Sequence, residues 1–171
     1  MSSTTSTPNP IIFDLIALTK PRVNFLIIFT AIVGMLLAQD FNLNYSLMIY
    51  ASIGIYLAAS AAAVINQIVD QKIDAIMDRT KSRPLIKGNV TSKHAIYFSI
   101  VISLISTYIL YEYVNTITTV LTLFSIIVYS IIYSVYLKNL TSQNIVIGGI
   151  AGAMPPLLLS LIHISEPTRR M

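Results

Sequence analysis

The sequence contains no cysteine among its 171 residues, and only 11% of the residues are charged. The missing cysteines exclude a disulfide framework and any nucleophile or metal site built on a thiolate. A soluble domain carries about 25% charged residues, whereas 55% of this chain is hydrophobic. A soluble globular protein is therefore excluded, and we expect a membrane protein that has the lipid bilayer as its solvent.

The excess of basic over acidic residues is small, and the net charge is +4. The Lys and Arg residues lie beside long apolar segments, where membrane topology explains them, so we expect no nucleic-acid partner. The N-terminal sequence MSSTTSTPNP lacks the basic start and the small-residue cleavage site of a secretory signal peptide. We expect residues 1–10 to form a disordered tail and the first apolar segment to be retained.

Several apolar segments approach the length that crosses a bilayer, roughly 17–25 helical residues. A shorter stretch, residues 11–19, is interrupted by Asp14 and is expected to lie in the interface as an amphipathic helix. Pro21 suits the first turn of the helix that follows. The predicted spans are residues 23–38, 45–65, 95–114 and 117–137, and a fifth begins near residue 145.

Basic residues mark one side of the predicted bundle. If the four spans alternate in direction, every Lys and Arg that flanks them falls on the same side, and the opposite loops, residues 39–44 and 112–116, contain neither. The positive-inside rule places the basic side in the cytoplasm. We expect a multi-pass protein of the cell (inner or plasma) membrane, with its N-terminus and the charged loop before the third span cytoplasmic. The basic residues are Lys20, Arg22, Lys72, Arg79, Lys81, Arg83, Lys87, Lys93 and Lys138.

The loop between the second and third spans, NQIVDQKIDAIMDRTKSRPLIKG (residues 66–88), gathers charges of both signs. Asn66, Asp70 and Asp74 are spaced i, i+4 and i+8, and each step of four residues drifts only ~40° around a helix. We predict that their side chains form a ladder on one face, with Lys72 on roughly the opposite face. Two carboxylates and an amide suit Mg²⁺, which takes one or two carboxylates and leaves other positions to water and substrate phosphate.

Basic residues follow the ladder directly. Arg79, Lys81 and Arg83 come next, and the guanidinium fork matches phosphate oxygens. Acids that hold metal ions and bases that hold the remaining charge of a diphosphate would make one coherent site. The alternative is a solvated loop that only fixes topology, but the helical spacing and the amide of Asn66 in apolar sequence favour a site. Pro84 is expected to end any helix and to keep the residue before it extended.

The pattern N-x₃-D-x₃-D-x₄-R-T-x₂-R-P in residues 66–84 resembles the first aspartate-rich motif of the UbiA superfamily of intramembrane prenyltransferases. Two further segments are similar to one family within it, the haem O synthases or protoheme IX farnesyltransferases. They are LTKPRVNFLIIFTAIVGMLLA (residues 18–38) and LTSQNIVIGGIAGAMPPL (residues 140–157). The resemblance extends from about residue 14 to residue 158 and is specific because three separate motifs carry it.

The resemblance implies an all-α polytopic bundle of nine spanning helices around a cavity, of which this chain holds about five from the N-terminal half. It implies transfer of a farnesyl group from farnesyl diphosphate to a vinyl group of haem B, giving haem O, with Mg²⁺ as cofactor. Haem B is then a substrate. The implied catalytic residues are Asp70, Asp74, Arg79 and Arg83; Asp70 and Asp74 bind the metal, and Asn66, Arg79, Lys81 and Arg83 bind the diphosphate.

The last residues depart from the family. LSLIHISEPTR, within residues 159–171, resembles the translation of a sequencing-library adapter. We therefore expect residues 11–158 to be a partial prenyltransferase domain and the tail to be foreign to it. The family has a second acidic motif between later spans, so we expect this chain to be inactive alone. Two alternatives stay open: a prenyltransferase of the same superfamily that acts on a quinone precursor or lipid, and a non-catalytic transporter or scaffold that binds a cation.

Overall fold

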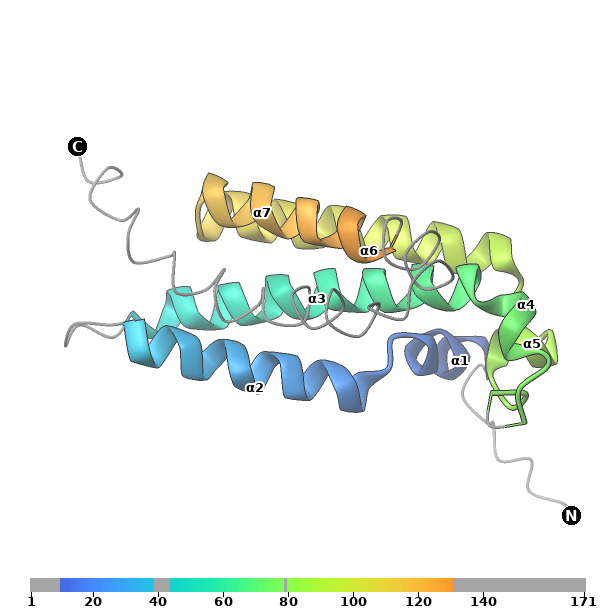
Figure 1. The fold of residues 1–171 in the computed structure, drawn as a ribbon. Coiled ribbons are helices and arrows are strands. Elements are labelled where there is room, and N and C mark those ends of the chain that lie inside the picture. The colour runs from blue at the N-terminus through green and yellow to red at the C-terminus, as the bar shows by residue number, and fades with distance from the viewer. Residues whose placement is uncertain (1–9, 39–43, 79, 131–171) are drawn as a thin grey trace, which may run out of the picture.

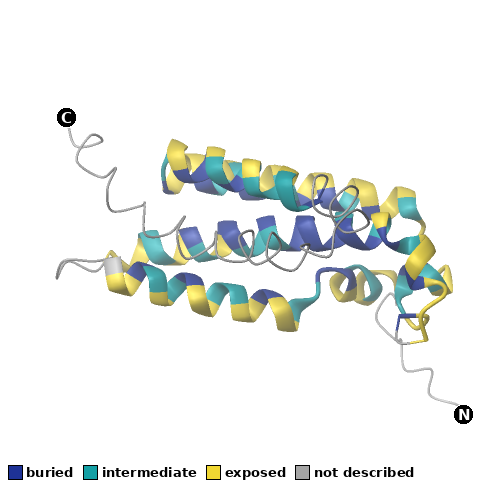
Figure 2. Cartoon of the chain, viewed as in Figure 1, coloured by how far each residue is buried: buried dark blue, intermediate teal, exposed yellow. Residues whose placement is uncertain are grey.

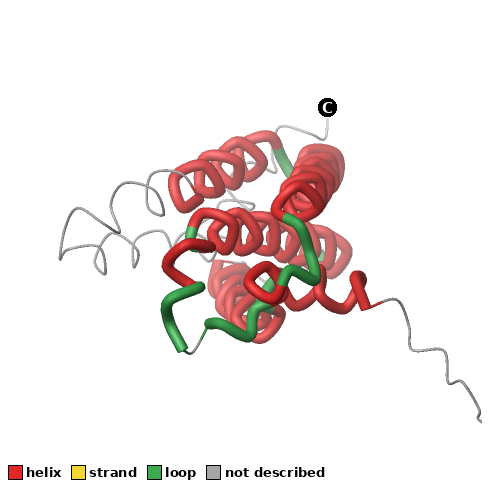
Figure 3. The backbone as a smooth tube through the Cα atoms, turned by 90° about the vertical axis from the view of Figure 1, so that its right-hand side faces the viewer, coloured by secondary structure: helices red, strands yellow, loops and turns green. Residues whose placement is uncertain are grey.

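The computed structural model describes residues 10–38, 44–78 and 80–130, and all regular structure within them is helical (Figure 1). The longer helices lie side by side, and the shortest gather at one end of the bundle, which faces the viewer in Figure 3. The predicted all-α class is confirmed for these residues, and the predicted fifth span and tail lie outside them. The elements are α1 (Pro10–Leu18), α2 (Pro21–Ala38), α3 (Tyr45–Val69), α4 (Gln71–Asp74), α5 (Pro84–Lys87), α6 (Ser92–Tyr113) and α7 (Thr116–Ile127).

Two helices, α3 with 25 residues and α6 with 22, are long and apolar enough to cross a membrane. The pair α1 and α2 qualifies together as one span bent by 46°, so the described part of the chain holds two or three candidate spans. Helical residues continue beyond the end of α7, and together they form a shorter apolar helix over Thr116–Ser130. The second and third predicted spans thus correspond to α3 and α6, and the first corresponds to α2, which qualifies only together with α1. The fourth begins as α7 before it leaves the described residues.

Polar side chains set where the helices begin. Asn44, Thr91 and Asn115 precede α3, α6 and α7, and each side chain accepts a hydrogen bond from the backbone N–H three residues later. Such caps satisfy N–H groups that have no partner inside the helix. The prediction for Pro21 is confirmed, because it opens α2, where its missing N–H is not needed.

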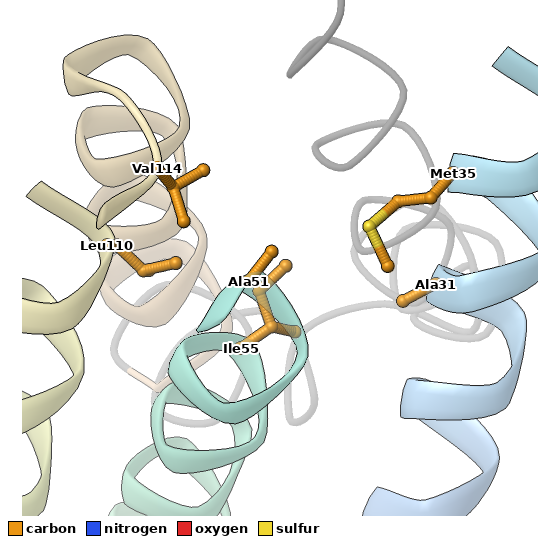
Figure 4. Close-up of a cluster of buried hydrophobic side chains, with 6 residues drawn as sticks. All are labelled: Ala31, Met35, Ala51, Ile55, Leu110 and Val114. Atoms are coloured by element: carbon orange, nitrogen blue, oxygen red, sulfur yellow. The ribbon is translucent and has the colours of Figure 1, made fainter. Parts of the chain in front are cut away.

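The central helix is α3, which packs against α2 on one side and α6 on the other. Buried positions follow its length, whereas the outer faces of its neighbours are exposed and apolar, as lipid contact requires (Figure 2). Side chains from the three helices meet in one apolar cluster (Figure 4). Its members are Ala31, Met35, Ala51, Ile55, Leu110 and Val114.

Gly54 lets α3 and α6 approach closely. A Cβ added to Gly54 would lie 2.5 Å from Cδ2 of Leu110, so no larger residue fits without movement. Ser106 of α6 donates its hydroxyl to the Gly54 carbonyl at 2.7 Å. Small residues and interhelical hydrogen bonds drive helix association in lipid, where the apolar environment gives little other preference. The close α3–α6 contact therefore fixes the position of α3 within the bundle.

A second apolar cluster fixes the charged end of the bundle. It joins α1, α3, α6 and the segment around α5, so the chain that follows α3 is held against both neighbours. The cluster thereby positions the polar residues described next. Its buried members are Leu18, Val64, Leu85, Val90 and Ala95.

Candidate functional site

The ladder residues Asn66, Asp70 and Asp74 lie where α3 gives way to α4. Their exposed fractions are 8%, 5% and 5%, whereas Lys72 is exposed. The helix is interrupted at Asp70, yet Asp70 N donates to Asn66 O at 3.0 Å and Asp74 N to Asp70 O at 2.8 Å. The four-residue register therefore continues through the interruption. The three ladder residues are buried and Lys72 is exposed, as expected if the ladder lies on one face of the helix and Lys72 on the other.

The chain turns back immediately after the ladder, and here the prediction that Pro84 ends the helix is wrong. Helix α4 already ends at Asp74, and Pro84 begins α5. The buried hydroxyl of Thr80 donates to the Asp74 carbonyl at 2.8 Å and thus satisfies an acceptor at the helix end. Arg83 is extended, with φ −64° and ψ 143°, as expected before proline.

The turn brings Arg83 beside the ladder. Its Nη1 donates to Oδ2 of Asp74, and the two side chains are only 25% and 7% exposed. Lys81 instead pairs with Asp78 at 2.7 Å, where the side chains are 54% and 96% exposed. The structure thus brings Arg83 to the buried Asp74 carboxylate and leaves Lys81 in a solvated pair. Arg79 lies outside the described residues.

Two carboxylates and one amide are the oxygen donors of this site. Among the residues that the structure describes, no group of three or more His, Asp or Glu side chains could hold a metal ion by itself. Part of the Asp74 carboxylate is taken by Arg83, and Asn66 and Asp70 each have an interaction partner. The donor set fits Mg²⁺ only if phosphate and water oxygens supply the remaining positions, which is the usual arrangement for this ion.

Sequence reasoning missed two buried amides that hold the α1–α2 junction. Gln67 donates from Nε2 to the Leu18 carbonyl at 2.6 Å, and so connects α3 to the end of α1. Asn24 of α2 donates from Nδ2 to the Thr19 carbonyl and to Oγ of Ser60, both at 2.8 Å. The available signal was an amide within an apolar helical sequence, which needs a partner at membrane depth. Together these bonds dock the α1–α2 junction against α3.

A third amide, that of Gln71, connects α4 to the segments that follow it. Gln71 Nε2 donates to the Leu85 carbonyl at 3.4 Å, and Ser92 donates its hydroxyl to Gln71 Oε1 at 2.9 Å. These contacts join α4 to α5 and to the start of α6. The segment that follows Arg83 is therefore held against α4, which is itself bound to the start of α6.

Comparison with known proteins gives a consistent result. A family model described as the UbiA prenyltransferase family matches residues 27–167. A protein of Hahella chejuensis named protoheme IX farnesyltransferase is 50% identical over 145 residues, which cover 85% of this chain and 48% of that protein. Proteins of the same name from Alcanivorax borkumensis and Xanthomonas campestris are 52% and 54% identical, over 85% and 82% of this chain and 48% of each relative. The chain spans about half the length of the curated relatives it matches, and no solved structure gives a significant match.

Proposed function

Because this chain belongs to the UbiA prenyltransferase family, we propose that it forms part of an enzyme that transfers a farnesyl group from farnesyl diphosphate to a vinyl group of haem B. The product is haem O. The family membership confirms the resemblance seen in the sequence and its all-α membrane fold class. Relatives named protoheme IX farnesyltransferase support the choice of substrates. The observation that carries the proposal is the buried column of Asn66, Asp70 and Asp74 with Arg83 bound to its end.

The site has the charges that departure of a diphosphate needs. Asp70 and Asp74 would hold Mg²⁺, which when bound acts as a Lewis acid on phosphate oxygens. Arg83 would exchange its bond to Asp74 for bonds to those oxygens. Its positive charge then stabilises the negative charge that develops as the C–O bond breaks. Preorganised charge of this kind is usually the largest catalytic contribution.

Water must be kept from the allylic cation until the haem vinyl group attacks it. The burial of the three ladder residues fits this requirement. The vinyl π electrons form the new C–C bond, the diphosphate leaves, and one water supplies the hydroxyl of the product and releases a proton. Asn66 and Arg83 serve here to hold and orient the diphosphate.

We also propose that the end of the bundle that carries α4 and α5 faces the cytoplasm, in the inner or plasma membrane. Described basic residues gather at this end, including Lys72, Lys87 and Lys93, whereas Glu112 lies near the opposite end of α6. This orientation can be tested by cysteine labelling, because the sequence contains no cysteine that would react in the background. A Lys87→Cys variant should react with an impermeant maleimide only when the cytoplasmic face is open. Labelling from the outer face of intact cells would contradict this orientation.

The activity is tested in a chimera, in which this chain replaces the aligned part of the Hahella chejuensis relative. Membranes that contain the chimera are incubated with farnesyl diphosphate, haem B and Mg²⁺, and haem O is measured by mass spectrometry. We expect haem O from the chimera and at least a roughly 100-fold lower rate from the Asp70→Asn, Asp74→Asn double variant. An undiminished rate in the double variant contradicts the site, and a prenylated quinone precursor without haem O favours the alternative substrate.

A further inference from the structure

The junction between α1 and α2 has an unusual backbone. Lys20 has a φ of +52°, and among the described residues no other non-glycine residue has a positive φ. Its N–H donates to Ala17 O at 3.3 Å, and its carbonyl accepts from Asn24 N at 3.2 Å, so Lys20 ends one helix and begins the next. Glycine is the residue that normally fills such a position, because a Cβ is disfavoured there. A lysine at this place makes its side chain a candidate for a functional role.

Buried amides hold this backbone from two directions. Gln67 binds the carbonyl of Leu18, and Asn24 binds the carbonyl of Thr19. Leu18 and Thr19 are themselves buried, whereas Lys20 is half-buried. Strained conformations persist where the surroundings fix them in this way, and they concentrate at functional sites.

The same contacts place Lys20 close to the ladder along α3. Gln67 is the neighbour of Asn66 in sequence and lies one helical turn before Asp70, so the Leu18 carbonyl touches α3 at the level of the ladder. Lys20 follows Leu18 by two residues, and α1 also packs against α5, next to Arg83 (Figures 1 and 3). The backbone of Lys20 therefore lies near the end of α3 that carries the carboxylate column, on a segment far from Arg83 in sequence. Lys20 has an interaction partner in the structure, which it would exchange for a ligand.

We propose that Lys20 binds the diphosphate of the prenyl substrate, as a second cation beside Arg83. This inference rests on the proposed function. An ammonium group offers three donors to phosphate oxygens and requires no bidentate geometry, so a lysine can approach from the helix junction while Arg83 approaches from α5. The docking bonds of Gln67 and Asn24 then act as positioning contacts for the lysine. The alternative is that Lys20 merely joins two helices.

The Lys20→Gly variant separates the two roles, because glycine keeps the left-handed backbone and removes the ammonium. In the chimera, in lipid nanodiscs with Mg²⁺, we would measure binding of the unreactive analogue farnesyl thiolodiphosphate by calorimetry, together with the Tm. We expect Kd to rise roughly 10- to 100-fold, the effect of losing a charge-assisted hydrogen bond. Tm should stay equal or rise, and Lys20→Arg should restore most of the affinity.

Lys72→Ala is the matched control, since Lys72 is exposed near the same end of α3, and its Kd should stay within about twofold of the unmodified value. An unchanged Kd in Lys20→Gly, with Asp70→Asn still losing affinity, overturns the inference and leaves the proposed function standing. A loss of affinity that comes with a lower Tm assigns Lys20 to the helix junction and also overturns it. If the unmodified chimera binds no analogue, the proposed function fails and this inference fails with it.

Discussion

The middle of α3 and its end are buried by different means. Around Gly54 the helix touches α6 through close approach, with Leu110 filling the space that a side chain would need and one hydroxyl bond from Ser106. From Asn66 onward the buried groups are polar, and partners on α1 and the α5 segment surround them. The middle of the helix is buried by close packing of small residues, and its end is buried by hydrogen bonds and a charge pair.

This difference shows where stability and chemistry reside. Close-packed small residues associate helices in lipid without any ligand. Buried carboxylates and amides are unfavourable at membrane depth unless partners satisfy them, so their retention at one end indicates a function. We therefore expect changes near Gly54 to affect stability first, and changes near Asp74 to affect catalysis first.

The largest effect is expected at the Asp74–Arg83 pair. Arg83→Ala removes the cation and should lower the rate of prenyl transfer in the chimera at least roughly 100-fold. It should also destabilise the fold, because the buried Asp74 carboxylate loses its partner. Adding Asp74→Ala should recover Tm but no activity, which haem O production and thermal unfolding would measure. Recovery of activity in the double variant would show that the pair is only structural.

Gly54→Ala should have the next largest effect, this time on stability. The new Cβ would meet Leu110 Cδ2 at 2.5 Å, and overpacking of this kind costs about 1–3 kcal/mol. The free energy of unfolding in mixed micelles should fall, and the affinity for the thiolodiphosphate should change little per folded molecule. Gly88→Ala is the control, since Gly88 has φ +78° and open space around it, so any destabilisation there comes from the backbone alone. Equal stability of Gly54→Ala and the unmodified protein would refute close approach at this point.

Ser106→Ala should have a smaller effect. It removes the hydroxyl bond to the Gly54 carbonyl, and interhelical hydrogen bonds in membranes average about 0.6 kcal/mol. Thr107→Val is the control on the same helix, because the Thr107 hydroxyl binds only the Ser103 carbonyl within α6. The same unfolding assay applies, and a larger loss in Thr107→Val than in Ser106→Ala would contradict the assignment of the α3–α6 contact.

The smallest effect is expected from Lys81→Gln. The family resemblance predicts that Lys81 binds diphosphate, and this prediction still awaits a test. The exposed pair of Lys81 with Asp78 predicts a change in stability below about 0.5 kcal/mol. The Kd for the thiolodiphosphate should rise less than about threefold, since a solvated lysine at this position contributes little. A tenfold loss of affinity would show that the lysine leaves Asp78 when substrate binds, and would support the predicted role of Lys81.

Much of the fold follows from local pattern. Helices α2, α3 and α6 lie where spans were predicted, and α7 begins one residue before its predicted start. Such positions can be predicted because apolar runs and capping residues exert their effect on neighbouring residues. The spacing of Asn66, Asp70 and Asp74 also suggested a shared face, and their common burial agrees with it. The error at Pro84 arose because the helix ends earlier, where the Thr80 hydroxyl binds the Asp74 carbonyl across six residues.

The sequence by itself determined a helical membrane protein, the position of its spans and the column of oxygen donors at the end of the second one. Helical periodicity and hydropathy are properties of neighbouring residues, so they can be read without the fold. Only the tertiary structure decided that Arg83 rather than Lys81 meets the carboxylates, and that Gln67 holds the strained junction at Lys20. Those contacts join residues 9 and 49 positions apart, and they depend on how the helices pack.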